Sequence, residues 1–353
     1  MINYTVSWGK KKICVGGQAP ILINQLVGCN GTSGVRECIE KIEMWELDNE
    51  SPDIITDVSL RNDNEKKIWE YAVEKEQYIV GTVPIYTCCS KTNIEKNELL
   101  EVIEKQLQSG VRIITIHITP EIEIINLAQK RIVPITSRGG GIVVKDFLLG
   151  KKEQNVYVRA IDEIISLCIK YNSVISIGTT FRPANIIDSL DEAQILEIEK
   201  QQYWAKYITE RGVRVLIEMP GHMPPKKIEV LNHILENNDY PIMPLGPVVT
   251  DVGIGMDHIT SSIGLTLMGL KNNVQIIAAM TSEEHTGKIP SIDSTREAVK
   301  IARLVAHIID MSRFEDYTKD YEYAIKRKTS CVIGHEESGC ERCGRWCPLR
   351  MTF

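Results

Sequence analysis

Short runs of β-branched residues alternate with amphipathic stretches along most of this chain. The stretch Val158–Tyr171 repeats apolar residues at three- and four-residue spacing, and the apolar run Val174–Gly178 follows it. Because continuous apolar strands are buried on both faces, this alternation predicts parallel strands joined by crossover helices. The expected strands are Ile21–Gly28, Asp53–Val58, Tyr78–Val83, Val111–His117, Ile132–Ser137, Val174–Gly178, Val213–Glu218, Ile242–Leu245 and Val274–Ala279.

The number of candidate strands points to a barrel. No Gly-rich dinucleotide turn follows the first strand, so the pattern favours an α/β fold of the (β/α)₈ TIM-barrel type over a doubly wound sheet, with one candidate strand in surplus. We expect an N-terminal segment over residues 1–20, a catalytic barrel over 21–293, a helical C-terminal region over 294–328 and a Cys-rich tail over 329–353.

Charge and hydropathy exclude two classes of partner. The 353 residues carry a formal net charge of −6, and the basic runs are short, at Lys10-Lys11-Lys12 and Lys326-Arg327-Lys328. This balance argues against nucleic acid binding. No segment has the apolar length of a membrane span, and the first residues lack the apolar region of a signal peptide. We therefore expect a cytoplasmic protein whose cysteines stay reduced.

Three cysteines of the tail are spaced as metal or cluster ligands. They form the run Cys340-Glu-Arg-Cys343-Gly-Arg-Trp-Cys347. Three such thiolates suit a [4Fe–4S] cluster whose fourth iron stays open to chelate S-adenosylmethionine. The alternative is a structural zinc site with Cys331 or His335 as fourth ligand. Zinc sites more often pair two separated Cys-x₂-Cys halves, and a single such half is present, which favours the cluster.

Polar residues after the predicted strands are candidates for the active site, because barrels of this type place function at the carboxyl ends of their strands. Glu218 and His222 flank a Pro-Gly turn, and His285 follows a later strand. Two such histidines suit a divalent metal with open coordination positions. The loop Ser137-Arg138-Gly139-Gly140-Gly141 is typical of a phosphate site, with Arg182 as a second cation.

Several segments stand together in the order of one known family. They are Gly81-Thr-Val-Pro-Ile-Tyr86, Thr115-Ile-His117, Ser137-Arg-Gly-Gly140, Arg182-Pro183, Asp191-Glu-Ala-Gln194, Ile217-Glu-Met-Pro-Gly-His222, Leu245-Gly-Pro247, Asp257-His-Ile-Thr260 and Glu284-His285. With them the chain resembles the phosphomethylpyrimidine synthase family, noncanonical radical S-adenosylmethionine enzymes that include the 5-hydroxybenzimidazole synthases of cobamide biosynthesis.

The resemblance implies a carbon–carbon lyase that rearranges aminoimidazole ribotide into the thiamine pyrimidine, 4-amino-5-hydroxymethyl-2-methylpyrimidine phosphate. It also implies a homodimer in which each cluster-bearing tail reaches the partner's active site, and an external electron donor. The implied metal, zinc or iron, would be held by His222 and His285, and the cluster by Cys340, Cys343 and Cys347. Catalytic roles fall to Tyr86, His117 and Glu218, and the full set of implied substrate-binding residues is Asn30, Tyr86, His117, Ser137, Arg138, Gly139, Thr179, Arg182 and Glu218.

The chain also departs from the family pattern. Thr179 stands where the family has an aspartate, Met243 where it has a tyrosine and Thr56 where it has a methionine, and Cys343 and Cys347 are separated by three residues instead of four. These departures favour a divergent paralogue. The alternatives are therefore a 5-hydroxybenzimidazole synthase, a non-catalytic ribotide-binding paralogue, and a zinc-tailed barrel hydrolase that uses His222 and His285.

Overall fold

Eight parallel strands form the centre of the larger of two units in the computed structural model. The structure describes residues 1–30, 34–46, 51–60, 67–88, 93–327, 331 and 342–350. The chain divides into Met1–Ile309 and Asp310–Phe353. The division of the chain into four segments, at 1–20, 21–293, 294–328 and 329–353, stays a prediction.

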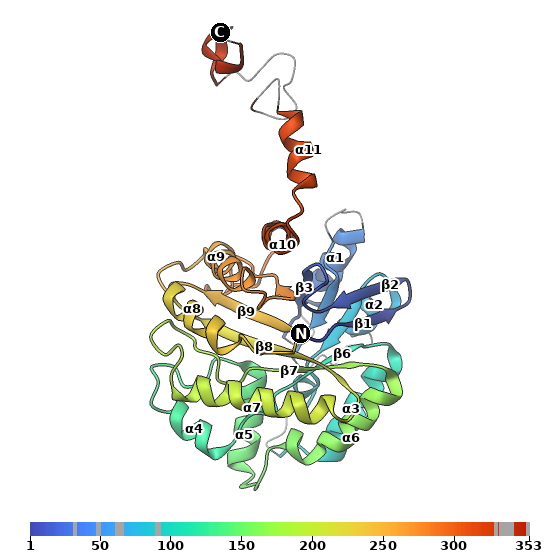
Figure 1. Ribbon diagram of the computed structural model, residues 1–353. Coiled ribbons are helices and arrows are strands. Elements are labelled where there is room, and N and C mark those ends of the chain that lie inside the picture. Colours follow the sequence, from blue (N-terminus) through green and yellow to red (C-terminus); the bar gives the residue numbers. More distant parts are fainter. Residues whose placement is uncertain are drawn as a thin grey trace. The chain divides into compact units, whose positions relative to one another are not determined.

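The strands of the larger unit form a nearly closed barrel (Figure 1). They pair in parallel in the order β10-β3-β4-β5-β6-β7-β8-β9. The backbone N–H of Gln275 donates to the carbonyl of Ile242 at 3.0 Å, which brings β9 beside β10. The predicted TIM-type fold is confirmed. The strand bounds are β3 (Leu22–Val27), β4 (Ile54–Asp57), β5 (Ile79–Thr82), β6 (Ile113–Ile116), β7 (Val174–Ile177), β8 (Arg214–His222), β9 (Ile242–Val248) and β10 (Ile276–Ala278).

Amphipathic helices cover the outside of the strands. The helix α6 begins after Asn155, whose side chain accepts from the N–H groups of Tyr157 and Val158, and ends at Asn172 in the left-handed conformation. Its apolar face is buried in the main core. The helices are α1 (Val35–Glu46), α2 (Ile68–Glu74), α3 (Lys96–Ser109), α4 (Ile122–Ala128), α5 (Arg138–Leu149), α6 (Val156–Tyr171), α7 (Glu192–Thr209), α8 (Pro225–Ile234), α9 (Asp257–Gly269) and α10 (Ile292–Phe314).

The predicted strand Ile132–Ser137 is wrong. Ile132 is 69% exposed, and its N–H and that of Val133 each donate to a carboxylate oxygen of Asp188 at 3.2 Å instead of to a neighbouring strand. Pro134 has no N–H to offer a ladder. With this segment a loop, the surplus strand disappears and eight remain.

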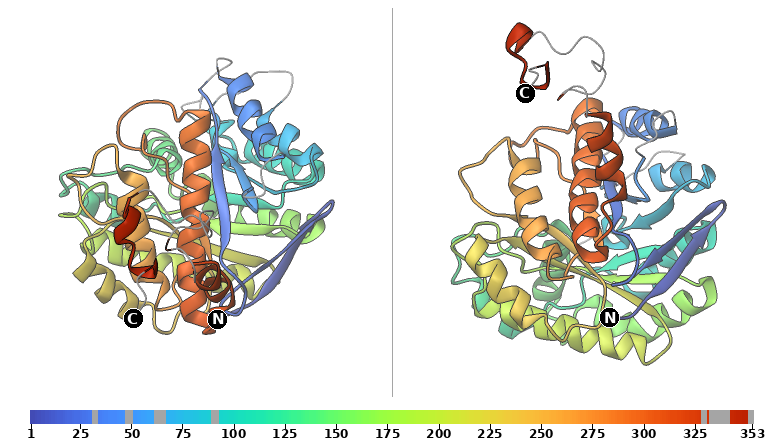
Figure 2. Two further views of the ribbon diagram at one scale, coloured as in Figure 1. Left: turned by 90° about the horizontal axis from the view of Figure 1, so that it is seen from above. Right: turned by 45° about the horizontal axis from the view of Figure 1, so that its top comes forward.

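An N-terminal hairpin closes the amino-terminal end of the barrel. Its strands are β1 (Tyr4–Trp8) and β2 (Lys11–Val15), within the segment to which the sequence analysis assigned no element. The hydroxyl of Tyr4 donates to the carbonyl of Val215 at 3.1 Å, near the start of β8, and Figure 2 shows the hairpin in dark blue. The hairpin and the barrel strands form one buried apolar layer, which consists of Val6, Ile13, Val15, Ile54, Ile79, Ile113, Val174, Leu216, Met243, Ile276 and Ala278. Because this end is filled with apolar side chains, polar chemistry is left to the opposite end.

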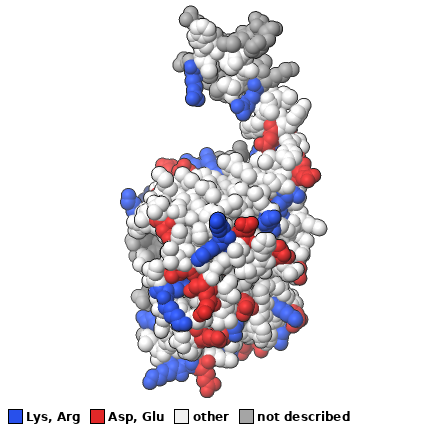
Figure 3. Space-filling view, turned by 60° about the vertical axis from the view of Figure 1, so that its left-hand side comes forward, with Lys and Arg blue, Asp and Glu red and all other residues white. Residues whose placement is uncertain are grey.

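The smaller unit contains α11 (Thr318–Lys326) and two short 3₁₀ turns, η2 (Gly344–Trp346) and η3 (Pro348–Arg350). The helical pattern predicted after Ser294 is confirmed by α10 and α11. Figure 3 shows one face of the molecule, on which Lys and Arg are interspersed with Asp and Glu. Among the described residues, no helix combines the length and apolarity that a membrane span requires.

Candidate active site

Glu218 lies buried at the carboxyl end of β8, inside the ring of strands. Its Oε1 accepts from the hydroxyls of Thr115 and Ser176, each at 3.0 Å, and the backbone N–H of Thr179 also donates to its carboxylate. Burial raises the pKa of Glu218, while the guanidinium of Arg182 and these donors act in the opposite direction. The carboxylate is thus fixed by groups from β6, from β7 and from the loop after β7.

His117 follows β6 and joins this site from the neighbouring strand. Its Nε2 lies 3.1 Å from the hydroxyl of Ser137, which itself accepts from the N–H of Gly140 as the N-cap of α5. Burial, reinforced by Arg182, lowers the pKa of His117 to about 3, so the imidazole is neutral at physiological pH. The Nδ1 of His117 is buried and has no hydrogen-bond partner among the described residues.

Glycines at the start of α5 allow the helix to approach this imidazole. A Cβ on Gly139 would lie 2.3 Å from Cε1 of His117, and one on Gly140 would lie 2.4 Å from Cγ2 of Thr180. The glycine N–H groups are already engaged, since Gly139 donates to Tyr86 and Gly140 to the hydroxyl of Ser137. The positive character of the predicted phosphate loop therefore comes from the helix terminus and the nearby arginines.

Tyr86 stands at the end of η1 (Pro84–Tyr86), after β5, and is buried. The guanidinium of Arg138 lies 5.4 Å from the centre of its ring, and one nitrogen of Arg138 donates to the carbonyl of Val58 at 3.3 Å. Burial raises the pKa of Tyr86, against the opposing charges of Arg138 and Arg182. The hydroxyl is therefore protonated at neutral pH.

The loop that carries Thr179 and Arg182 is held by a buried carboxylate from α7. Glu197 accepts from the hydroxyl of Thr179 at 2.9 Å, from that of Thr119 at 2.6 Å, and from the N–H groups of Thr180 and Phe181 at 2.7 and 2.8 Å. The Thr179 hydroxyl is thereby committed to Glu197. Arg182 donates to the carbonyl of Thr179 at 3.0 Å.

His222 and His285 converge, as the sequence predicted. Their Nε2 atoms are 3.2 Å apart. The Nδ1 of His222 pairs with Asp251 and the Nδ1 of His285 with Asp257, each at 2.7 Å. Each carboxylate fixes the orientation of its imidazole, and the two Nε2 atoms lie close enough either to share a hydrogen bond or to ligate one metal ion together.

This histidine pair adjoins the Glu218 site through the backbone. The N–H of His222 donates at 3.0 Å to the carbonyl of Pro183, the residue after Arg182. The structure therefore gathers most predicted site residues at one end of the barrel: Tyr86, His117, Ser137, Arg138, Gly139, Thr179, Arg182, Glu218, His222 and His285.

The remaining predicted residues are placed less fully. Asn30 is exposed after β3, where it forms an isolated parallel bridge with Leu60. Cys343 and the buried Cys347 flank η2, and Cys340 lies outside the described residues. Among the residues that the structure describes, no group of three or more His, Cys, Asp and Glu is arranged to hold a metal ion.

One kind of positioning residue was missed from the sequence, and the partners of a second kind were not foreseen. Gln194, Glu197 and Gln201 form a buried polar stripe on α7, at three- and four-residue spacing. Gln194 donates to the carbonyl of Pro220 and Gln201 to that of Glu218, each at 2.8 Å. Polar residues on the inner face of an otherwise apolar helix were the available signal. The pairing of Asp251 and Asp257 with the histidines had no local signal.

Comparison with known proteins identifies the family. The model of the Radical SAM ThiC family matches residues 1–332. The chain belongs to this family. The phosphomethylpyrimidine synthase of Finegoldia magna is 32% identical over 320 residues, which cover 81% of this chain and 73% of that protein. The phosphomethylpyrimidine synthase of Carboxydothermus hydrogenoformans is 32% identical over 272 residues, which cover 73% of this chain.

The chain spans 63% of the length of the Carboxydothermus relative. Among solved structures, a 7,8-dihydropteroate synthase from Vibrio fischeri covers 88% of this chain and 99% of its own, with a TM-score of 0.47 and 9% identity. A likeness of this size carries no inference about function.

Proposed function

We propose that this member of the Radical SAM ThiC family is a radical S-adenosylmethionine lyase that rearranges aminoimidazole ribotide or a close analogue. The observation that carries the proposal is the convergence of the His222–His285 pair with the buried group formed by Glu218, His117 and Arg182. The first group suits a metal and the second a polar, phosphorylated substrate.

The buried group offers complementary contacts to a ribotide. The Nδ1 of the neutral His117 is free to pair with a substrate group, and the carboxylate of Glu218 offers an acceptor to the amine or imidazole of a substrate. Arg138, Arg182 and the amino terminus of α5 provide positive charge for a phosphate. Tyr86, protonated and next to Gly139, supplies a further hydroxyl. These roles extend the family resemblance to this chain's own atoms.

The histidine pair fits a tetrahedral divalent metal such as zinc or iron. Two ligands at 2.0–2.1 Å from zinc in tetrahedral geometry stand about 3.3 Å apart. The Nε2 atoms of His222 and His285 are 3.2 Å apart, and each imidazole is backed by a carboxylate. We propose that this metal binds part of the substrate or of S-adenosylmethionine in its open positions.

The tail would complete the enzyme. When bound by Cys340, Cys343 and Cys347, a [4Fe–4S] cluster would supply the electron that cleaves S-adenosylmethionine reductively. Cys343 and Cys347 are the N-cap and the C-cap of the single 3₁₀ turn η2. We further propose a cytoplasmic homodimer with exchanged tails and an external electron donor, neither nucleic acid nor membrane being a partner.

One observation favours a substrate other than aminoimidazole ribotide. Thr56 and Met243, two positions that depart from the family pattern, share a partner inside the barrel. The hydroxyl of Thr56 donates to the Oδ1 of Asn24 at 3.0 Å, and the Nδ2 of Asn24 donates to the sulfur of Met243 at 3.2 Å. Two departures, on β4 and β9, that are joined through Asn24 of β3 fit a divergent paralogue, such as a 5-hydroxybenzimidazole synthase or a ribotide-binding protein without catalysis.

The test is product analysis with the anaerobically reconstituted protein. Aminoimidazole ribotide, S-adenosylmethionine and dithionite are supplied, and products are identified by mass spectrometry. The pyrimidine phosphate supports the leading proposal, and 5-hydroxybenzimidazole supports the paralogue. Ribotide binding by calorimetry with no product from a fully loaded cluster supports the non-catalytic alternative. A zinc-loaded protein free of iron supports the hydrolase. Glu218→Gln, which keeps size and removes the charge, is the matched inactive control.

A further inference from the structure

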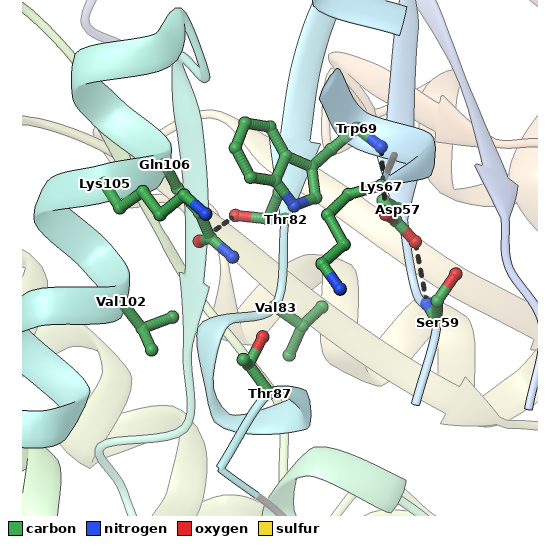
Figure 4. Close-up of a pocket in the computed structure, with 10 residues that line it drawn as sticks. All are labelled: Asp57, Ser59, Lys67, Trp69, Thr82, Val83, Thr87, Val102, Lys105 and Gln106. Carbon is green, nitrogen blue, oxygen red and sulfur yellow. Dashed lines mark hydrogen bonds between the residues drawn. The ribbon is translucent and has the colours of Figure 1, made fainter. Parts of the chain in front are cut away.

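A cavity lies between α2 and α3, and none of the residues that line it belongs to the candidate active site. Its volume is about 90 Å³. About 10–15 Å³ of such volume holds one water, so the cavity holds a group of roughly six to nine heavy atoms. Figure 4 shows the residues that line it, which come from the ends of β4 and β5 and from the two helices: Asp57, Ser59, Lys67, Trp69, Thr82, Val83, Thr87, Val102, Lys105 and Gln106.

Hydrogen-bond donors converge on this cavity. Gln106 is 96% buried, and its Oε1 accepts from the hydroxyl of Thr82 at 2.8 Å. This bond turns the Nε2 of Gln106 toward the cavity, where the hydroxyl of Thr87 also points (Figure 4). The ammonium of Lys105 stands at the rim, and its ion-pair partner Glu70 is 3.9 Å away, beyond hydrogen-bond distance. The amide nitrogen of Gln106 thus lacks a protein acceptor among the described residues.

Acceptors in the same cavity are already used. Asp57 is the one acid among the lining residues, against the two lysines Lys67 and Lys105. Its Oδ1 accepts from the N–H of Ser59 at 2.9 Å and its Oδ2 from the N–H of Trp69 at 3.0 Å. Asp57 is therefore engaged by the backbone, by Ser59 and by the charge of Lys67, and the amide of Gln106 and the ammonium of Lys105 remain as donors toward the cavity.

Apolar groups form the remaining wall. The indole of Trp69 and the side chains of Val83 and Val102 face the same space (Figure 4). We propose that this cavity is a second small-molecule site, which takes an organic anion with a carboxylate or phosphate head and a small apolar body. The head would bind Gln106, Thr87 and Lys105, and the body would pack on Trp69.

Calorimetry with benzoate and benzamide tests the proposal, because the two probes share a ring and differ in charge. Benzoate is expected to bind at least about tenfold more tightly than benzamide, as a charge-assisted hydrogen bond contributes about 1.5–3 kcal/mol. Gln106→Glu places a negative charge beside the carboxylate of benzoate, so it should weaken benzoate binding by at least about tenfold. Inorganic phosphate is the second probe and shows which head is preferred.

Three controls locate the binding. Lys105→Gln, at an exposed position that leaves folding intact, weakens benzoate binding several-fold, whereas Lys170→Gln on the surface of α6 does not. Benzoate packed on the indole of Trp69 is expected to change the tryptophan fluorescence, and Trp69→Phe should remove that change. Arg182→Ala keeps benzoate binding, which separates this cavity from the active site. Absence of benzoate binding by the natural chain, unchanged binding in Gln106→Glu and Lys105→Gln, or its loss in Arg182→Ala would each overturn the proposal.

Discussion

Replacement of Asp257 by asparagine tests how the histidine pair is built to hold a metal. Asp257 is almost fully buried, with 3% of its side chain exposed, and its Oδ1 pairs with the Nδ1 of His285 at 2.7 Å. Its Oδ2 also accepts from the backbone N–H of His285 at 3.3 Å. The carboxylate therefore orients the imidazole and raises the basicity of its Nε2.

The expected loss follows from charge and burial. An asparagine still accepts from Nδ1, but the hydrogen bond is no longer charge-assisted, which removes about half of its 1.5–3 kcal/mol. That loss, about 0.75–1.5 kcal/mol, corresponds to roughly 4–13-fold, which reaches the lower end of the 10–100-fold typical of a lost outer-shell carboxylate. Asp251 makes the same 2.7 Å contact to His222, but 35% of its side chain is exposed. Solvent screens that pair, so Asp251→Asn costs less than Asp257→Asn.

The assay is competition between the protein and a chromogenic zinc chelator. Asp257→Asn is expected to weaken zinc binding about fourfold or more, and Asp251→Asn by less than about threefold, with thermal unfolding midpoints measured to confirm that both variants fold. An affinity of Asp257→Asn within twofold of the natural chain, or a larger loss in Asp251→Asn, refutes the reasoning.

Three further predictions concern the buried groups around Glu218 and His117. Glu197→Gln removes a carboxylate that accepts from two hydroxyls and two backbone N–H groups. Urea denaturation should therefore show a loss of roughly 2–4 kcal/mol in unfolding free energy. A loss under about 0.5 kcal/mol contradicts the role assigned to Glu197. Gly139→Ala forces a Cβ to within 2.3 Å of His117 and should lower the unfolding free energy by about 1–3 kcal/mol. In the matched Gly141→Ala the Cβ meets nothing within 4 Å, so that variant should be as stable as the natural chain or more stable. Equal thermal unfolding midpoints of the two variants would contradict the close approach of Gly139 to His117. Burial raises the pKa of Glu218, so its contribution to stability is largest below its ordinary pKa of 4.5 and is lost as the pH rises through the raised value. The stability of Glu218→Gln relative to the natural chain should therefore improve as the pH rises above 4.5, and a constant difference contradicts this.

The barrel was predictable because its strands are buried on both faces. Val174–Gly178 had no polar alternation, and β7 occupies Val174–Ile177. The error at Ile132–Ser137 arose because β-branched residues also occur in loops whose backbone finds a distant partner. Here that partner is Asp188, and no local pattern announces such a contact. The hairpin was missed although Val6, Ile13 and Val15 alternate with exposed residues around the Gly9-Lys10 turn.

The site was predictable where a rule of the fold applies. Glu218, His222 and His285 follow strands, and parallel strands bring their carboxyl ends together. The rule places backbone positions and says nothing of the partner that each side chain takes. Thr179 was assigned to the substrate, and its hydroxyl instead donates to Glu197 from a helix. Such choices depend on packing between elements distant in sequence.

Release of 5′-deoxyadenosine tests the central claim most directly. The protein is reconstituted anaerobically until iron and sulfide analysis shows a full cluster, and the nucleoside is quantified by chromatography with and without aminoimidazole ribotide. We expect 5′-deoxyadenosine from the natural chain and none from Cys343→Ala, which removes a proposed cluster ligand. A fully loaded natural protein that releases no 5′-deoxyadenosine would contradict the proposed radical chemistry.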